Sequence, residues 1–331
     1  MRKACALIDA AVAAGADIVK FQSFVVDAVV TPAAPKAAYQ VASTAPDESL
    51  HAMLTRLQLT PTEFTTIADH CRAQGIEFLA TAFDAESLAL ICSLGIRRLK
   101  VPSGEITNVP YLRAIAAHRL PVLLSTGMST LAEVSGAVGL LREAGVARDQ
   151  ITVLHCTSAY PTPMADVNLR AMTTMGAQLG LPIGYSDHTP GWEVSVAAVA
   201  LGAIVIEKHL TLNRHDPGPD HAASLEPAEF AAMVRAVRNV TAALGDGVKA
   251  PQPSEVETAQ VSRRSITAST AIRAGEILTP DNITTRRPGT GISPLLWDEV
   301  IGSRASRDFH PGEAIDFPGE VIENPRGMIG T

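Results

Sequence analysis

The chain has 331 residues, 47% of them hydrophobic and 18% charged, which is enough apolar material for a buried core and more than one typical domain needs. Its formal net charge of −7 argues against nucleic acid or an anionic membrane surface as a partner. Any anionic ligand must therefore be held by a few well-placed cations. We find no signal segment at the start and no apolar run long enough to span a bilayer, so we predict a cytoplasmic protein.

Seven short segments, nearly continuous in apolar residues, are predicted as strands over residues 17–22, 76–80, 96–101, 121–124, 151–155, 184–188 and 205–209. Helices are predicted before and between them, over residues 1–14, 60–74, 84–93, 111–117, from 130, 167–178, 192–202 and 227–244. Strands this apolar are buried on both faces, as in a parallel sheet covered by helices. The Ala- and Pro-rich segment 25–47 is longer than an ordinary connection and is predicted to be a functional lid.

Polar side chains follow the C-terminal end of every predicted strand. Enzymes built on a (β/α)8 barrel place their chemistry at that end of the barrel. A doubly wound sheet binds ligands only at its switch point, so we favour a TIM barrel that is one strand short. We predict this barrel over residues 1–244, a linker over 245–262, and a small β-rich domain over 263–331 in which the turns 272–277 and 309–314 resemble each other.

Two of the predicted strands, 184–188 and 205–209, end in histidine. Side chains alternate along a strand, so Ser186 and His188 share one face, as do Glu207 and His209. Neighbouring parallel strands lie roughly 5 Å apart, so the two imidazoles can approach one metal ion from adjacent strands. The alternative is a pair of hydrogen-bonded structural histidines.

Seven motifs occur in order along residues 20–221. They are Lys20-Phe21-Gln22, Lys100-Val101-Pro102-Ser103-Gly104-Glu105, Ser125-Thr126-Gly127-Met128-Ser129, His155-Cys156-Thr157-Ser158-Ala159-Tyr160-Pro161, Gly184-Tyr185-Ser186-Asp187-His188-Thr189, Glu207-Lys208-His209 and Gly218-Pro219-Asp220-His221. In this order and spacing they resemble the bacterial sialic acid synthases, which include N-acetylneuraminate synthase and its legionaminate and pseudaminate relatives. Residues 263–265 and 286–292 resemble the antifreeze-like (SAF) domain at the C-terminal end of these proteins.

The resemblance implies an enzyme, a transferase of the EC 2.5.1 type that condenses phosphoenolpyruvate with the open-chain aldehyde of an N-acetylated hexose such as N-acetylmannosamine. Carbon 3 of phosphoenolpyruvate attacks the aldehyde, water adds at carbon 2, and phosphate leaves with C–O cleavage. The family uses a divalent metal, most often manganese, with magnesium or cobalt as alternatives. By resemblance, His188 and His209 are the expected metal ligands.

The resemblance also implies roles for other side chains. The expected catalytic residues are Glu105, Glu207 and Lys100. The expected substrate-binding residues carry cations, hydroxyls or other polar groups; they are Lys20, Gln22, Thr81, Lys100, Ser103, Ser125, Ser158, Tyr160, Ser186, Asp220 and Arg287. Within this set Arg287, from the second domain, is expected to enter the barrel of a partner subunit and bind the N-acetyl group, which implies a domain-swapped homodimer.

Several of these residues also have plain structural interpretations. Glu105 could simply cap the helix that follows it, and Lys20 could be a lysine at the end of a strand with its charge near water. Arg287, beside another arginine, could be a solvated cation. Asp187 is interpreted as orienting a histidine or the loop, and His155 as a core residue.

The family begins with a strand that carries an acidic residue, and no such segment precedes Met1. We therefore expect a barrel that lacks its first strand, leaves the strands of Lys20 and Glu207 unpaired at their edges, and has little or no synthase activity as written. Competing hypotheses are a metal-free aldolase in which Lys20 or Lys100 forms a Schiff base, and a non-catalytic sugar-binding protein. Segments 25–47 and 213–224 are expected to read the acetamido pattern of the sugar, and which nonulosonic acid is made stays open.

Overall fold

The computed structural model describes residues 1–45 and 47–316. It forms two compact units, one from Met1 to Asp246 and one from Gly247 onward. Part of the expected linker is helical, because α12 covers Val256–Ser262 directly after a 3-10 turn at Pro253–Glu255. The N–H of Gln252 donates to the Glu255 carboxylate at 2.8 Å, and proline at the first position suits a helix start.

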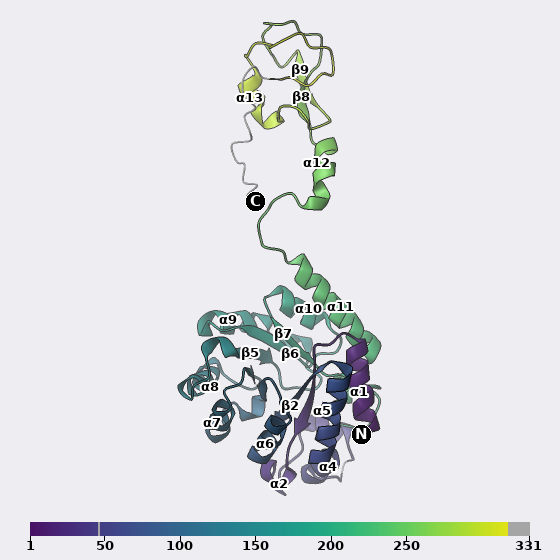
Figure 1. Cartoon of the computed structure of the whole chain (residues 1–331), viewed down its shortest axis with the longest axis vertical. Helices are drawn as coiled ribbons and strands as arrows, with labels where there is room; N and C mark the ends of the chain where they lie inside the picture. The colour runs from purple at the N-terminus through teal and green to yellow at the C-terminus, as the bar shows by residue number, and fades with distance from the viewer. Residues whose placement is uncertain (46, 317–331) are drawn as a thin grey trace. The chain divides into compact units, whose positions relative to one another are not determined.

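Seven strands form one parallel sheet in which every strand pairs with its successor in the chain (Figure 1). They are β1 Ile18–Ser23, β2 Glu77–Ala82, β3 Leu99–Val101, β4 Val122–Ser125, β5 Ile151–Cys156, β6 Ile183–Asp187 and β7 Val205–Lys208. This consecutive order is that of a barrel, whereas a doubly wound sheet reverses its order at a switch point. The prediction of a barrel-like α/β fold with seven strands is thus confirmed. That a first strand is lacking stays a prediction.

The helices of the first unit lie around the outside of the curled sheet (Figure 1). The longer ones are α1 Arg2–Ala13, α5 Pro61–Gln74, α6 Ala85–Ser93, α7 Val109–Ala117, α8 Leu131–Glu143, α9 Leu169–Leu179, α10 Glu193–Ala200 and α11 Pro227–Ala243. Helix α1 packs against both α5 and α11. Capping boxes start α5 and α8, as the Thr-x-x-Glu patterns predict. None of the helices in the described ranges combines the length and apolar character that a membrane crossing needs.

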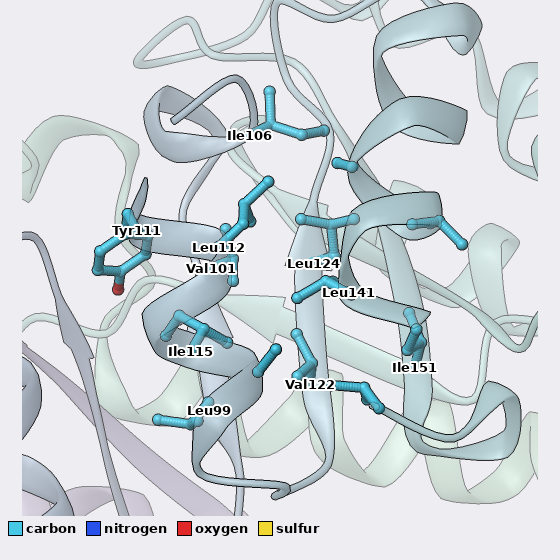
Figure 2. Close-up of a cluster of buried hydrophobic side chains, with 14 of the residues drawn as sticks. Leu99, Val101, Ile106, Tyr111, Leu112, Ile115, Val122, Leu124, Leu141 and Ile151 are labelled. Atoms are coloured by element: carbon cyan, nitrogen blue, oxygen red, sulfur yellow. The ribbon is translucent and has the colours of Figure 1, made fainter. Parts of the chain in front are cut away.

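Between the sheet and the helices lies the main apolar core (Figure 2). Leu99 and Val101 of β3 and Leu124 of β4 have no exposed surface, and Leu112 of α7 is 1% exposed. Burying such side chains is the main favourable contribution to folding, at roughly 25 cal/mol per Å² of apolar surface. This core fixes the strands that carry the polar groups described below.

The inside of the curled sheet is divided into an apolar layer and a polar layer. The apolar layer consists of side chains that the strand registers bring together, namely Ile18, Leu79, Leu123, Leu154 and Val205. The residues two positions further along several of these strands are polar, and they include Lys20, Thr81, Ser125 and Glu207. Since alternate residues share a face, the apolar layer forms a floor beneath a polar layer at the carboxyl end of the strands.

Segment 25–47, which we predicted as a long loop acting as a lid, is partly helical. Its role as a lid stays a prediction. The segment contains the short helices α2 Val26–Val29 and α3 Ala38–Ser43, and α4 Leu50–Leu57 follows. Residue 46 lies outside the described residues. Alanine favours helix formation, and Ser49 caps α4 by accepting a hydrogen bond from the N–H of Ala52 at 3.1 Å.

The second unit has a small core around an antiparallel pair, β8 Ser265–Ala268 and β9 Ile283–Arg286, with the short helix α13 Trp297–Val300. The two similar turns of its sequence lie opposite each other. Ile272 and Phe309 exchange backbone hydrogen bonds of 3.0 and 2.8 Å. The internal symmetry in the sequence therefore corresponds to paired segments. Residues 317–331 of the predicted domain lie outside the described residues.

Replacing Leu112 by alanine should lower the free energy of unfolding of the first unit by about 2–5 kcal/mol, because the change opens a cavity in the core. The matched control is Leu201→Ala, at a side chain that is 44% exposed, where we expect less than about 1 kcal/mol. The measurement is denaturant unfolding followed by fluorescence in a Trp297→Phe background, so that Trp192 alone reports on the first unit. Equal losses in the two variants would contradict this account of the core.

Candidate active site

A carboxylate with two lysines is the centre of the polar layer. Lys100 Nζ on β3 donates to both oxygens of Glu207 on β7, at 2.9 and 2.8 Å. Lys20 Nζ on β1 lies 3.5 Å from Glu207 Oε2, and the Ser186 hydroxyl on β6 donates to Oε1 at 2.7 Å. Side chains of β1 and β7, the first and last strands of the described sheet, therefore meet inside it.

Burial and charge act against each other at this centre. Burial lowers the pKa of Lys100, whose side chain is 2% exposed, while the adjacent Glu207 carboxylate acts against that shift. Burial alone would raise the pKa of Glu207, but Lys100 and Lys20 hold it well below its usual range. Glu207 is therefore an anion that holds two cations side by side.

The two histidines lie next to this centre, with ring centroids 5.4 Å apart. The Nδ1–H of His188 donates to the carbonyl oxygen of Thr157 at 2.7 Å. A carbonyl can only accept, so Nδ1 carries the proton and Nε2 keeps a lone pair. Burial lowers the pKa of His188, and burial together with His188 and Lys20 lowers the pKa of His209 to about 3. Both rings are thus neutral imidazoles at neutral pH.

A divalent cation fits the donor chemistry of the two rings. A ligating histidine typically gives its second ring N–H to a carbonyl or a carboxylate, and His188 does so to Thr157. His209 Nδ1 lies 4.0 Å from Asp220 Oδ2. Across residues 1–45 and 47–316 no group of three or more His, Cys, Asp or Glu side chains is placed to hold a metal. The two imidazoles could therefore hold the ion only together with water or substrate oxygens, a mixed ligand set that suits manganese.

A cradle of small polar groups surrounds Gly127, just after β4. The Gly127 N–H donates to Ser103 Oγ at 3.0 Å, and Ser103 Oγ lies 3.2 Å from Cys156 Sγ. A methyl group on Gly127 would lie 2.3 Å from Ser158 Oγ and 2.9 Å from Ser103 Oγ. The predicted residues Ser103 and Ser158 thus converge on the glycine, in a space that a side chain there would fill.

Two further predicted hydroxyls are buried in the polar layer, on Thr81 and Ser125. Thr81 is the register partner of both Gln22 and Lys100. Among the described residues its Oγ1 is one of two buried side-chain oxygens without a hydrogen-bond partner. An unpaired buried hydroxyl costs roughly 1–3 kcal/mol, which a ligand oxygen at this position would relieve.

Aromatic rings cover the histidines. The Tyr160 ring centroid lies 4.2 Å from that of His188 and 5.8 Å from that of His209. The ring centroid of Tyr39, on α3, lies 5.1 Å from that of Tyr160. Burial, with the nearby carboxylate of Asp220, raises the pKa of Tyr39 to about 12. Tyr39 was not identified in the sequence, where it is a single aromatic residue in an Ala-rich segment.

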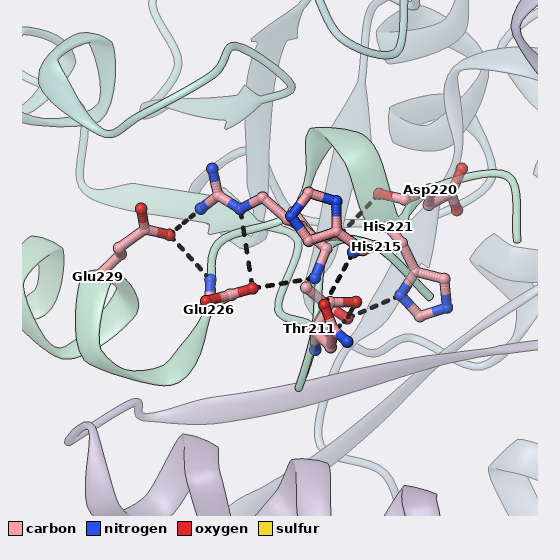
Figure 3. Close-up of polar contacts among 9 residues, drawn as sticks. Thr211, His215, Asp220, His221, Glu226 and Glu229 are labelled. Atoms are coloured by element: carbon pink, nitrogen blue, oxygen red, sulfur yellow. Dashed lines mark hydrogen bonds and ion pairs between the residues drawn. The ribbon is translucent and has the colours of Figure 1, made fainter. Parts of the chain in front are cut away.

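The segment after β7 that carries Asp220 is held by its own polar contacts (Figure 3). The hydroxyl of Thr211 is 2.7 Å from His221 Nδ1, next to Asp220. Arg214 forms an ion pair with Glu229. We predicted Asp220 as a sugar contact, and the structure places it beside His209 with its pKa raised by burial. Asp220 therefore lies close to His209 and near Tyr39 of α3.

The remaining predicted residues lie further from this centre or have other contacts. The Glu105 carboxylate accepts a hydrogen bond of 2.6 Å from the side-chain amide of Asn108. Asn108 itself is the N-cap residue of α7, so the interpretation of Glu105 as the helix cap is wrong. Gln22 is exposed near the end of β1. Arg287 is exposed in the second unit, after β9. His155 Nε2 donates to the carbonyl oxygen of Val167 at 2.9 Å, which is a structural role.

Replacing Glu207 by glutamine should destabilise the first unit by about 3 kcal/mol, because it leaves Lys100 buried without a carboxylate. The double variant Glu207→Gln/Lys100→Met should recover most of this loss, since it removes both charges. Glu77→Gln is the matched control, because Glu77 forms a more exposed pair with Arg98 at 2.7 Å, and we expect about 1 kcal/mol there. Denaturant unfolding checks this, and a double variant that is less stable than Glu207→Gln would contradict it.

The sequence matches the NeuB family over residues 7–249 and the SAF domain over residues 263–318. N,N'-diacetyllegionaminic acid synthase from Campylobacter jejuni is 44% identical over 93% of this chain and 92% of that protein. Pseudaminic acid synthase from Campylobacter jejuni is 33% identical over 93% of this chain and 89% of that protein. The expected resemblance to this group of synthases is confirmed.

A solved structure agrees with these matches. The sialic acid synthetase from Leptospira borgpetersenii, crystallised in complex with citrate, is 32% identical and superposes with a TM-score of 0.67. The match covers 78% of this chain and 84% of that one. The chain therefore belongs to the NeuB family and carries a SAF domain.

Proposed function

We propose that the chain is a nonulosonic acid synthase that condenses phosphoenolpyruvate with an N-acetylated hexose. The observation that carries the proposal is the convergence of Lys20 and Lys100 on Glu207, beside two neutral imidazoles, at the carboxyl end of the strands. In an acidic chain, this convergence supplies the local positive charge that a multiply charged anion needs. The named activities of its relatives support the same reaction.

The phosphate and the carboxylate of phosphoenolpyruvate are assigned to the lysines and hydroxyls of the polar layer. Lys100 and Lys20 provide charge-assisted hydrogen bonds to anionic oxygens. The hydroxyls of Ser103, Ser158 and the unpaired Thr81 add neutral donors around them. These groups are fixed by strands and tight turns, so anion binding costs little conformational entropy.

In the proposed reaction a bond forms between carbon 3 of phosphoenolpyruvate and the aldehyde carbon of the sugar. Water adds at carbon 2, and phosphate leaves as its C–O bond breaks. A divalent cation held by His188 and His209 would act as a Lewis acid on the aldehyde oxygen. The tautomer of His188, fixed by Thr157, directs a lone pair toward such an ion.

We assign different tasks to the two predicted acidic residues, Glu207 and Glu105. A carboxylate whose pKa lies well below its usual range is a weak base, so Glu207 suits the holding of two lysines better than proton transfer. We assign proton transfer to Glu105, which lies on the 3-10 turn directly after β3. Lys100 has a tight partner in Glu207, which favours anion binding by this amine over the Schiff-base alternative.

The sugar is assigned to the side of the site that the lid covers. Tyr160 and Tyr39 offer ring faces there, and Gln22 and Asp220 offer polar groups. Arg287 is proposed to complete this side from a partner subunit in a domain-swapped homodimer. The chain is 44% identical to a diacetyllegionaminic acid synthase but 32% identical to a sialic acid synthetase. This difference favours a hexose with two acetamido groups over one with a single group.

The proposal departs from the expectation of little or no synthase activity, because the described side chains already form the charged polar layer. It predicts phosphate release from phosphoenolpyruvate with Mn²⁺ and a hexose that carries two acetamido groups, at a rate at least tenfold above that with N-acetylmannosamine. Removing the metal with a chelator should abolish release, and Mn²⁺ should restore it. His188→Ala and His209→Ala should each lower kcat by more than about 100-fold, a typical loss for a group that stabilises developing charge. Release is measured continuously with a coupled phosphate assay.

Three results would contradict parts of this proposal. Full turnover in chelator would exclude the metal-dependent mechanism and favour the Schiff-base aldolase, which borohydride would trap on a lysine. Sugar binding without any phosphate release would favour the sugar-binding protein. Equal rates with both sugars would contradict the assigned substrate class alone.

Replacing Gly127 by alanine should raise KM for phosphoenolpyruvate by at least tenfold, because the methyl group displaces the hydroxyls of Ser103 and Ser158. The KM for the sugar should change much less. The matched control is Gly136→Ala in α8, where an added methyl group has no neighbour within 4 Å and KM should not change. An unchanged KM for phosphoenolpyruvate in the Gly127 variant would show that the cradle does not bind this substrate.

A further inference from the structure

Behind the candidate site, on the outward face of β6 and β7, lies a second buried ion pair. Asp187 and Lys208 are register partners at the ends of these strands, and Lys208 Nζ lies 3.1 Å from Asp187 Oδ2. Neither side chain has any exposed surface. Because side chains alternate across a strand, the pair faces away from Ser186 and Glu207, which point into the sheet.

The pair ties down the chain on both sides of His188. Asp187 Oδ1 accepts hydrogen bonds from the N–H of Thr189 at 2.8 Å and from its hydroxyl at 2.7 Å. Asp187 Oδ2 accepts a third from the hydroxyl of Ser195 in α10 at 2.6 Å. Lys208 Nζ donates to the carbonyl oxygen of Thr189 at 2.5 Å. The residues before and after His188 are thereby bonded to the residue that precedes His209.

The energetics of such a pair indicate a role other than stability. Removing two charges from water costs about as much as their attraction returns, and replacing a buried pair by apolar side chains is often neutral or stabilising. The outward positions of β3 and β4 are filled by apolar side chains such as Val101 and Leu124. If packing were the only requirement at positions 187 and 208, apolar residues would therefore meet it.

The position of β7 at the end of the described sheet explains what the ion pair does. In the described sheet β7 is an end strand that pairs only with β6. It carries Glu207, and His209 follows it directly. A slip of one residue would turn these side chains to the outer face. The ion pair is formed in the observed register, in which Asp187 faces Lys208, and it would be lost on slipping.

We propose that Asp187 and Lys208 are positioning residues that set the separation of His188 and His209, and thereby the affinity of the two imidazoles for a divalent cation. The inference rests on the proposed function, because it takes the two histidines as cation ligands. Asp187 acts through Thr189 on the backbone of His188, and Lys208 acts through the backbone that leads into His209. Neither side chain touches the ion or the substrate.

The test is a titration of the full chain with Mn²⁺ in the absence of substrate, in which the free ion is followed by electron paramagnetic resonance. In Asp187→Asn/Lys208→Met, which removes both charges while keeping the side-chain shapes similar, we expect Kd to rise at least tenfold. Lys208→Arg keeps a cation for Asp187, so its Kd should stay within about threefold of the unmodified chain. Ser195→Ala removes a single hydrogen bond to Asp187 and should raise Kd two- to fivefold, which keeps the test available if the double variant does not fold.

Two controls separate positioning from general destabilisation. Glu77→Gln/Arg98→Met removes another ion pair of the same unit, and its Kd for Mn²⁺ should not change. Melting temperatures of all variants are measured without metal, and the loss of Mn²⁺ affinity should not follow them. His188→Ala/His209→Ala should remove the Mn²⁺ site.

The outcomes distinguish this inference from the function on which it rests. If the double histidine variant removes Mn²⁺ binding but the Asp187/Lys208 variants and Ser195→Ala bind with unchanged Kd, the pair is only structural and the inference is wrong. If the double histidine variant binds Mn²⁺ as well as the unmodified chain, the proposed cation site itself is wrong, and the inference fails with it.

Discussion

The structure depends on the bonds that Glu207 makes inside the curled sheet. This single carboxylate joins side chains from β1, β3 and β6 to β7, so it links the two end strands of the described sheet through its interior. The same bonds keep two ammonium groups close together in a site with little water, where their repulsion would otherwise separate them. One carboxylate therefore links the end strands of the sheet and also holds the two lysines of the proposed anion site.

The apolar floor strengthens the interactions of these charged groups. Leu79, Leu123 and Leu154 are buried below the charged groups, so the polar layer rests on an apolar layer that excludes water from that side. A reduced dielectric strengthens every interaction of the lysines and makes unpaired groups costly. The unpaired hydroxyl of Thr81 is such a costly group, and its persistence suits a site that a polar ligand completes. Burial also lowers the pKa values of His188 and His209 and so keeps both rings neutral.

Much of this arrangement could be predicted from local patterns. The strands and the facing of Ser186, His188, Glu207 and His209 follow from apolar runs and a period of two. The barrel order follows from the polar residues at the end of every strand. Contacts between distant residues could not be predicted in this way. The bond from Lys100 to Glu207 spans 107 residues, and only the curling of the sheet brings the two together. The position of Tyr39 depends on the path of segment 25–47. The role of Thr157 lies in a backbone carbonyl that has no signal in the sequence.

The residues that follow one another along β6 and β7 show how a single strand can serve two purposes. Ser186 and Glu207 point inward to the lysines, whereas their neighbours Asp187 and Lys208 point outward to each other. In the proposed function the inward charges bind the substrate and must stay accessible. The outward charges are buried against α10 and bond backbone and hydroxyl groups. A histidine placed directly after both kinds of residue receives its electrostatic environment from one face and its position from the other. Successive side chains of a strand point to opposite faces of the sheet. Neighbouring residues of a short motif can therefore have different roles.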